Sequence, residues 1–347
     1  MEDLKNTVPL LDQISQPGFL VKNHQIIQVN QSASAMLLCP GQDFDALLCT
    51  GREEYEDGTA GQLCLTLMIG GREHGAAILR MEDADLVLLD SLQDQEEFRS
   101  MALVSMELRM PLMQAINSAR QLEAEAAPAA AKMNQSLMQL LRLVSNMADI
   151  SRYTASARME LRDVDSFLTE LFEKARTLAP GSISVTFDGL QHPVFSRMDP
   201  EQLERAVWNI LSNCIKFMPE GGTIAAKLVH RGNRLQLTIA DSGSGIAGHI
   251  RSTLFQRYLR QPGIEDSRYG LGLGMAIVRT VAANHGGTVL ISGGIHGGTT
   301  VTLTFPIRQD GGSALHSPVF RPDYTGGFDH GLVELSDCLT SEAYQEL

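Results

Sequence analysis

The chain has 347 residues, of which 44% are hydrophobic and 20% are charged, and its net charge is −13. This length predicts two or three domains, and the composition is that of an ordinary globular protein. The negative charge argues against nucleic acid or an anionic membrane as the main partner, because both require a cationic surface. No apolar stretch approaches the ~18 residues of a membrane span, and the N-terminus lacks the apolar run of a signal peptide, so a cytoplasmic protein is expected.

Residues 1–92 are expected to form a first unit built from short strands. Apolar runs separated by glycine and turn residues predict strands at residues 19–21, 26–29, 63–69, 75–79 and 86–89. Asn30 is expected to cap a short helix that continues to Leu38. This order of elements resembles a PAS domain, an antiparallel sheet with helices over one face. The resemblance implies a sensor that holds a ligand or serves for dimerisation.

The second unit, residues 93–157, is predicted to be a pair of helices. The first helix runs from Asp94 to about Glu125 and has apolar residues at heptad-like spacing, which favours packing against another helix. The segment around Pro128 is expected to break this helix, because proline cannot continue a helix. The second helix carries a dimer-type seam of apolar residues, at Met133, Leu137, Leu140, Val144 and Met147. Because two helices alone bury little apolar surface, pairing with a second chain into a four-helix bundle is expected.

Residues 105–112, SMELRMPL, resemble the phosphoacceptor box of sensor histidine kinases. Members of that family typically read SHELRTPL, so six of the eight positions agree. The resemblance implies a dimerisation and phosphotransfer domain in which Met106 stands at the position of the phosphorylated histidine. Met110 replaces the threonine used in dephosphorylation, whereas Glu107 and the helix-bending Pro111 are retained.

The third unit, residues 158–308, alternates helices and strands around a glycine-rich middle, which predicts an α/β sandwich. Its expected helices are at residues 165–178, 199–217 and 275–284, and its expected strands are at residues 183–188, 223–230, 234–240 and 301–306. The whole chain is therefore predicted to be a multi-domain α+β protein.

The long helix at 199–217 carries Asn209, Asn213 and Lys216 at spacings that place them on one face. Carboxamide oxygens suit Mg²⁺, and an ammonium group neutralises phosphate. From this helix alone, an exposed polar face is the better interpretation. Asp241, however, directly follows a predicted strand, where its carboxylate can accept a hydrogen bond from an exocyclic amine such as that of adenine.

Glycine clusters follow the same order along the chain. Residues 241–246, DSGSGI, allow backbone to approach a ring closely. Residues 270–274, GLGLG, run into a predicted helix whose first N–H groups would bind phosphate. Residues 297–300, GGTT, precede the last strand. Together with the Asn–Asn–Lys stripe and the segment LFQRYLR at 254–260, these clusters match the N, G1, F, G2 and G3 boxes of the Bergerat-type (GHKL) ATP-binding fold. The F box points to its histidine-kinase branch.

The resemblance implies ATP and Mg²⁺ as ligands. Asn213 would bind Mg²⁺, Lys216 would contact the terminal phosphates, and Asp241 would bind the adenine amino group. The other residues implied to bind ATP are Asn209, Gly243, Gly245, Ile246, Tyr258, Arg260, Gly270, Leu271, Gly272, Leu273, Gly274 and Thr299. Tyr258 and Arg260 would belong to a mobile lid. Asn209 stands where ATP-hydrolysing relatives have a glutamate base, so fast hydrolysis is not expected.

The sequence leaves three functional hypotheses. No histidine occurs between residues 75 and 190, and the thioether of Met106 cannot accept a phosphoryl group as a histidine nitrogen does. The preferred hypothesis is a two-component pseudokinase, a dimer that binds ATP·Mg and acts by changing shape or holding a partner. The second is a transferase that phosphorylates a histidine of another protein, such as a related kinase in a heterodimer. The third is a weak conformational ATPase, against which Asn209 argues. A response regulator is a further candidate partner.

Residues 309–347 begin with glycine and proline residues. They are expected to form a linker followed by a short docked or protein-binding element, in which Ser336 caps a terminal helix.

Overall fold

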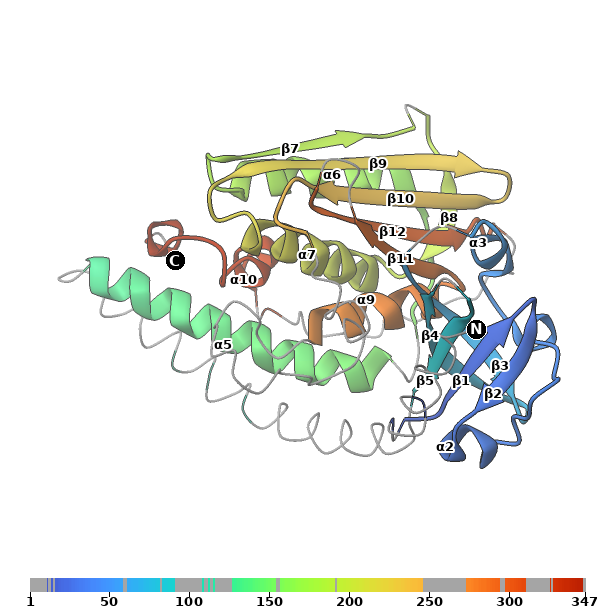
Figure 1. Ribbon diagram of the computed structural model, residues 1–347. Helices are drawn as coiled ribbons and strands as arrows, with labels where there is room; N and C mark the ends of the chain where they lie inside the picture. The colour runs from blue at the N-terminus through green and yellow to red at the C-terminus, as the bar shows by residue number, and fades with distance from the viewer. Residues whose placement is uncertain are drawn as a thin grey trace.

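The computed structural model describes residues 11, 14, 16–58, 61–81, 83–90, 108, 112, 115, 127–153, 157–190, 192–245, 273–293, 297–309, 325 and 327–345. Over these residues the fold is mixed α+β, with a ten-stranded sheet, a separate two-stranded sheet, and helices beside the larger sheet (Figure 1). The strand order in the large sheet is β2-β1-β5-β4-β3-β11-β12-β10-β9-β7.

The N-terminal part of the chain supplies half of this sheet. Its elements are β1 (Gly18–Lys22), β2 (Gln25–Val29), α2 (Gln31–Ser34), η1 (Asp45–Leu47), α3 (Arg52–Glu56), β3 (Gln62–Ile69), β4 (Arg72–Arg80) and β5 (Asp85–Leu89). All five predicted strands are therefore confirmed. The predicted cap is also confirmed, because the Asn30 side chain accepts a hydrogen bond from the Ala33 N–H at 2.9 Å. The helix ends at Ser34 rather than Leu38, because Leu37 has a φ of +67°, a left-handed conformation that interrupts a helix.

Helix α5 (Ala127–Tyr153) is the second predicted helix of the central unit. It begins one residue before Pro128, so the proline lies in its first turn, and the predicted end of the preceding helix lies outside the described residues. A proline is tolerated there because the first N–H groups of a helix have no acceptor within it. Of the first predicted helix, Leu108, Leu112 and Ala115 are described, and all three are helical.

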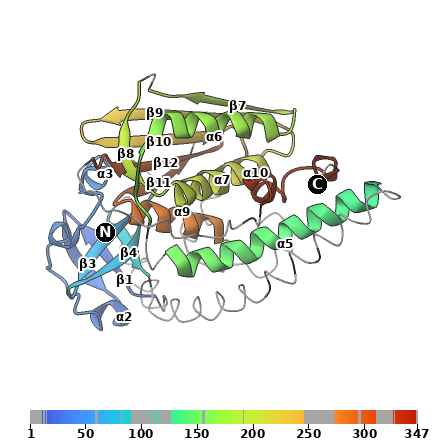
Figure 2. The same cartoon turned by 180° about the vertical axis from the view of Figure 1, so that it is seen from behind.

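One face of α5 packs against the rest of the chain. The buried positions on that face are Asn134, Met138, Leu141, Ser145 and Asp149. The predicted seam lies beside this face, and its residues Met133 and Leu140 keep 39% and 51% of their surface exposed. Figure 2 shows α5 extending below α9 and reaching the C-terminal end of the chain.

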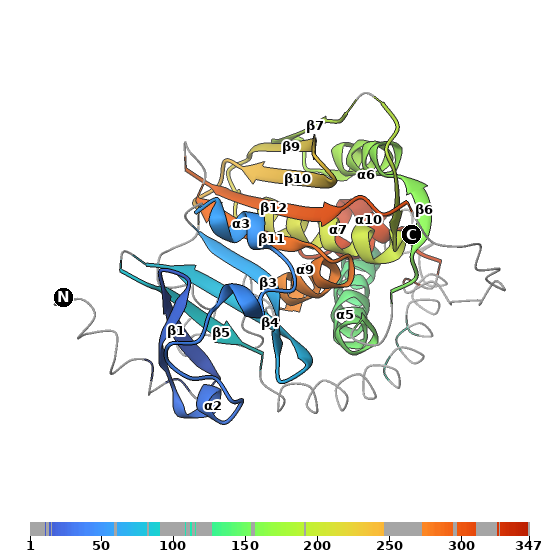
Figure 3. The same ribbon diagram turned by 90° about the vertical axis from the view of Figure 1, so that its right-hand side faces the viewer.

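The C-terminal half of the sheet is covered by helices on one face (Figure 3). The elements of this part of the chain are β6 (Glu160–Asp163), α6 (Val164–Leu178), β7 (Ile183–Asp188), β8 (Phe195–Met198), α7 (Pro200–Lys216), β9 (Gly222–Arg231), β10 (Arg234–Asp241), α9 (Leu273–Asn284), β11 (Thr288–Gly293) and β12 (Thr299–Pro306). Strands β6 and β8 pair with each other in the separate two-stranded sheet, and the other five strands belong to the large sheet. The predicted helices and strands are confirmed within two residues at each end. Strands β6, β8 and β11 were not predicted.

The two halves of the sheet join where β3 pairs antiparallel with β11. In this pairing Cys64 lies opposite Val289 and Gln62 lies opposite Ile291. An ion pair of 2.6 Å between Arg279 of α9 and Asp90, just after β5, ties the same two regions together. The segments expected to be separate units therefore share one continuous sheet. Within the described ranges, no helix combines the length and apolar character needed to cross a bilayer.

The C-terminal segment, residues 327–345, folds back onto the helices. It contains α10 (His330–Glu334) and the 3₁₀ helix η3 (Ser341–Tyr344). The expectation that Ser336 caps a helix was wrong. Asp329 caps α10 instead, accepting a hydrogen bond from the Leu332 N–H at 3.1 Å, and Ser336 is buried after the end of that helix.

Candidate functional site

Helix α7 positions the polar stripe predicted from the sequence. Asp199 is its N-cap, whose side chain accepts a hydrogen bond from the Gln202 N–H at 3.1 Å, and Pro200 occupies its first turn. Buried apolar residues, among them Val207, Ile210 and Leu211, fix its rotation against the sheet. This rotation leaves Asn213 and Lys216 partly accessible and buries Asn209.

The Asn209 side chain lies against the start of α9. Its Nδ2 donates to the Arg205 carbonyl at 2.9 Å. Its Oδ1 is buried and has no hydrogen-bond partner among the described residues. The same oxygen faces Gly274, where an added Cβ would lie only 2.6 Å from it. The glycine therefore allows a buried carboxamide oxygen to reach the beginning of the helix that follows the GLGLG segment.

Asp241 is the last residue of β10, and its carboxylate is held in place by backbone groups. Its Oδ1 accepts hydrogen bonds from the Gly243 N–H at 2.8 Å and the Thr299 N–H at 3.1 Å. Burial raises the pKa of this carboxyl above its usual value, although both backbone bonds and the Cys214 thiol act in the opposite direction. Cys214 belongs to α7, so Asp241 links β10, the start of β12 and the helix that carries the polar stripe.

Close backbone packing around Asp241 requires a glycine at position 298. Gly298 has a φ of +78°, and a Cβ there would overlap the backbone oxygen of Asp241. Gly245, with a φ of +73°, packs against the Gly298 backbone from the other side. The first and last glycine boxes of the sequence thus meet at Asp241.

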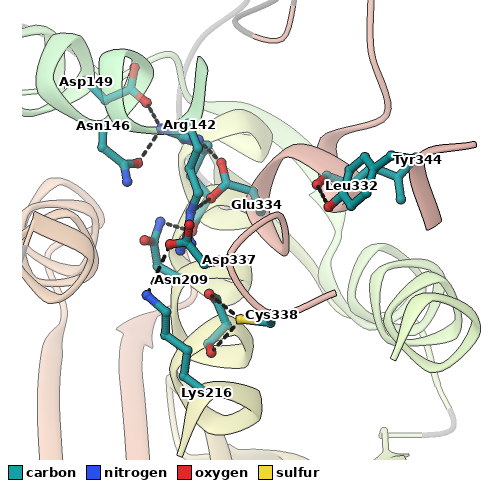
Figure 4. A network of polar contacts seen from close by, with 12 residues as sticks. Arg142, Asn146, Asp149, Asn209, Lys216, Leu332, Glu334, Asp337, Cys338 and Tyr344 are labelled. Atoms are coloured by element: carbon teal, nitrogen blue, oxygen red, sulfur yellow. Dashed lines mark hydrogen bonds and ion pairs between the residues drawn. The ribbon is translucent and has the colours of Figure 1, made fainter. Parts of the chain in front are cut away.

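Lys216, the last residue of α7, has an acidic partner from the C-terminal segment. Its Nζ lies 3.1 Å from Oδ2 of Asp337, and the same oxygen lies 2.8 Å from Nη1 of Arg142 on α5 (Figure 4). The Lys216 side chain is 11% exposed and that of Asp337 is 34% exposed. Sequence reasoning did not identify Asp337 or Arg142, because nothing local in the sequence indicates that residue 337 returns to α7.

A buried charge network lies directly behind this ion pair. Arg205 of α7 contacts Asp149 of α5 at 2.5 Å and also contacts Glu334 of α10. Arg142 contacts Glu334 at 3.3 Å, and Asn146 accepts from Arg205 at 2.8 Å. Three segments that are far apart in sequence are therefore joined through charges. One signal was present in the sequence: Arg205 falls on the apolar face of an amphipathic helix, where a cation requires an acidic partner.

Among the predicted site residues, the structure brings Asn209 to Gly274. It also brings Asp241 to Gly243 and Thr299. Leu273 is buried at the first position of α9. The predicted residues that lie outside the described ones are Ile246, Tyr258, Arg260, Gly270, Leu271, Gly272, Met106, Glu107 and Met110.

Comparison with known proteins identifies relatives of this part of the chain. Residues 198–309 match a family described as histidine kinase-, DNA gyrase B-, and HSP90-like ATPase. The sensor-like histidine kinase SenX3 of Mycolicibacterium smegmatis is 31% identical over 191 residues, which are 52% of this chain and 48% of that protein. The sensor histidine kinase TmoS of Ectopseudomonas mendocina is 29% identical over 272 residues, 74% of this chain and 28% of that protein. The chain spans less than half the length of either relative.

A solved structure shows a similar arrangement. The crystal structure of full-length ShkA in complex with AMPPNP aligns with 61% of this chain and 46% of its own, with a TM-score of 0.50 and 25% sequence identity.

Proposed function

This chain belongs to the histidine kinase family and carries its GHKL-type ATP-binding domain, and we propose that it is a regulatory pseudokinase of a two-component system. In this proposal the protein holds ATP with Mg²⁺, forms a dimer through its helical unit, and signals through its shape and its partners. The observation that carries the nucleotide assignment is the carboxylate of Asp241, fixed by two backbone N–H groups beside the polar stripe of α7.

The adenine amino group is assigned to Asp241. Because Gly243 and Thr299 hold Oδ1, the orientation of the carboxylate is set before a ligand arrives, and its other oxygen can accept from the exocyclic amine. Backbone at Gly245 can approach the ring, since no side chain intervenes. The phosphates are assigned to Gly270, Gly272 and Gly274 at the start of α9 and to Lys216 at the end of α7.

Mg²⁺ is assigned to Asn213, with Asn209 beside it. The residues fit this ion, because the buried Oδ1 of Asn209 has no other hydrogen-bond partner among the described residues and a carboxamide oxygen is a suitable ligand for Mg²⁺. Bound Mg²⁺ would neutralise phosphate charge. Asn209 Nδ2 already donates to the Arg205 carbonyl, and a carboxamide cannot activate water as a base. The chain is therefore proposed to hold ATP rather than hydrolyse it quickly.

The loss of phosphoryl chemistry is inferred from the helical unit. Met106 and Met110 occupy the two reactive positions, and no histidine lies between residues 75 and 190 that could substitute. The contacts around the ATP-binding domain support the other part of the proposal, signalling through shape. It is joined to the N-terminal, PAS-like unit through β3 and β11, and to α5 through Arg205 and Asp149. The exposed side chains of Met133 and Leu140 on α5 support a dimer through this helix.

The nucleotide site is tested with Asp241→Asn. The variant replaces an ionised acceptor with an amide, and a hydrogen bond to a charged group contributes about 1.5–3 kcal/mol, so ATP affinity should fall about 10- to 100-fold. Titration calorimetry with ATP measures this, and Asp188→Asn is the matched control, because Asp188 is an exposed acid at the end of β7. An affinity of Asp241→Asn equal to that of the control would refute the adenine assignment.

A second candidate function is phosphoryl transfer to a histidine of a partner protein. It is favoured by the retained nucleotide-contacting residues on α7, β10 and α9. Incubation of γ-labelled ATP with the chain and a candidate partner kinase distinguishes the two functions. Label on the partner that requires this chain and is lost with Asp241→Asn would replace the pseudokinase proposal with the transferase.

A further inference from the structure

The C-terminal segment, residues 327–345, is built into the main hydrophobic core. Its apolar side chains at Val333, Leu335 and Tyr344 are fully buried, and Phe328 and Leu339 are nearly so. They belong to the same cluster of buried residues as α5, α6 and α7. In Figures 1 and 2 the segment lies between the N-terminal end of α5 and the end of α7. This burial fixes the segment in one place.

Side chains of α5 also hold the backbone of this segment. Gln135 Nε2 donates to the Leu339 carbonyl at 2.7 Å, and Gln139 Nε2 donates to the Ser336 carbonyl at 3.1 Å. Such bonds satisfy carbonyls that would otherwise be buried without a donor. These two hydrogen bonds therefore fix where the turn that carries Asp337 lies along α5.

The buried network then sets which side chain faces the end of α7. Glu334 is fully buried between Arg205 and Arg142. Asp337 follows three residues later and emerges at Lys216, where its Oδ2 bridges the ammonium at 3.1 Å and the Arg142 guanidinium at 2.8 Å (Figure 4). The Cys338 thiol contacts Ser212, one turn earlier on α7, at 3.4 Å. The segment therefore contacts the last turn of α7 at Ser212 and Lys216.

We propose that the C-terminal segment is an internal competitor for the phosphate end of the nucleotide site, with the Asp337 carboxylate occupying the cation that ATP phosphates would contact. This inference rests on the proposed role of Lys216. An incoming triphosphate has to displace Asp337 from Lys216, and it can do so because it carries more negative charge than one carboxylate. Displacement leaves Arg142 facing the new charge, so the nucleotide state is communicated to α5.

The competition predicts a gain in ATP affinity when Asp337 loses its charge. In Asp337→Asn, ATP should bind about two- to fivefold more tightly, the range expected for removal of one partly exposed ion pair. Adenosine should bind the variant and the wild type equally, because it has no phosphate to compete. The matched control is Glu342→Gln, which removes the same charge from an exposed position of the same segment and should leave both affinities unchanged.

Calorimetric titrations of the full chain with ATP and with adenosine decide between the outcomes. Unchanged or weaker ATP binding by Asp337→Asn, with normal adenosine binding, would overturn the competition while leaving the nucleotide site intact. Absence of binding of either compound to either protein would refute the nucleotide site itself, and the competition with it. In Lys216→Ala the added Asp337→Asn change should give no gain, because the shared cation is absent.

A measurement on the wild-type chain keeps the proposal testable if the variant does not fold. Saturating ATP should increase hydrogen exchange at residues 337–339 by freeing the Asp337 side chain from Lys216, whereas adenosine should not. Equal exchange with the two compounds would contradict the proposal.

Discussion

Removal of the Glu334 carboxylate should destabilise the whole assembly of α5, α7 and the C-terminal segment. Glu334 is fully buried and contacts both Arg205 and Arg142. In Glu334→Ala, Arg205 retains Asp149 and Arg142 retains Asp337, so each arginine loses one carboxylate and keeps another. Breaking a buried ion pair typically costs 3–5 kcal/mol. Because each cation keeps a partner, we expect the lower end, about 3 kcal/mol.

Thermal unfolding measures this change. For a chain of this size about 2 °C of Tm corresponds to 1 kcal/mol, so Glu334→Ala should lower Tm by about 6 °C. Glu342→Gln, an exposed change in the same segment, should remain within about 1 °C of the wild type. Asp149→Asn should also destabilise, and the double variant should lose more than the sum, because the Arg205 guanidinium then lacks both the Asp149 and the Glu334 carboxylates. A Tm of Glu334→Ala equal to that of Glu342→Gln would refute the docked position of the C-terminal segment.

Three further predictions follow from the same structure. Gly298→Ala should destabilise the chain by about 2 kcal/mol or more and should weaken nucleotide binding. The reason is that residue 298 has a positive φ and an added Cβ would overlap the backbone of Asp241. An unchanged Tm would contradict this expectation. Burial lowers the pKa of His285, whose Nε2 accepts a hydrogen bond from the Asp199 N–H at 3.0 Å. The neutral imidazole therefore contributes stability that is complete above the unfolded-state pKa of histidine, and this stability falls as the pH drops below about 6.5. Thermal unfolding of wild type and His285→Gln across that range should show a smaller pH slope in the variant. Burial raises the pKa of Asp241, so adenosine affinity should fall on acidification at a higher pH than for an exposed aspartate, and Asp241→Asn should lack this titration.

The local elements could be predicted from the sequence because their signals are local. The local apolar pattern predicted β9 and β10, and the amphipathic pattern from Asp199 to Phe217 predicted α7 within one residue. The expected end of the helix after Asn30 was too late, because the left-handed turn at Leu37 has no glycine to indicate it. The segment around Pro128 was expected to separate the two helices, and residues 127–130 instead form the first turn of α5, where a proline is tolerated.

The long-range contacts could not be predicted from one sequence. The pairing of β3 with β11 depends on the free edges of two strands, and edge position is not encoded in the apolar pattern of either strand. The contact of Asp337 with Lys216 arises from burial of Val333, Leu335 and Tyr344, which the glycine- and proline-rich start of the tail conceals. The glycine boxes, by contrast, did carry information about long-range contacts. Gly274 and Gly298 are required by contacts with Asn209 and Asp241, so their positions in the sequence carry information about distant partners.

Incubation of the purified chain with γ-labelled ATP tests the central claim most directly. Calorimetry in parallel should show ATP binding, and the wild-type protein should carry no acid-labile, base-stable label, because Met106 has no nitrogen to phosphorylate. Met106→His serves as the positive control and should acquire such a label if the ATP-binding domain can still transfer a phosphoryl group. Acid-labile, base-stable label on the wild-type chain would contradict the account of a nucleotide-binding protein that has lost its phosphoacceptor.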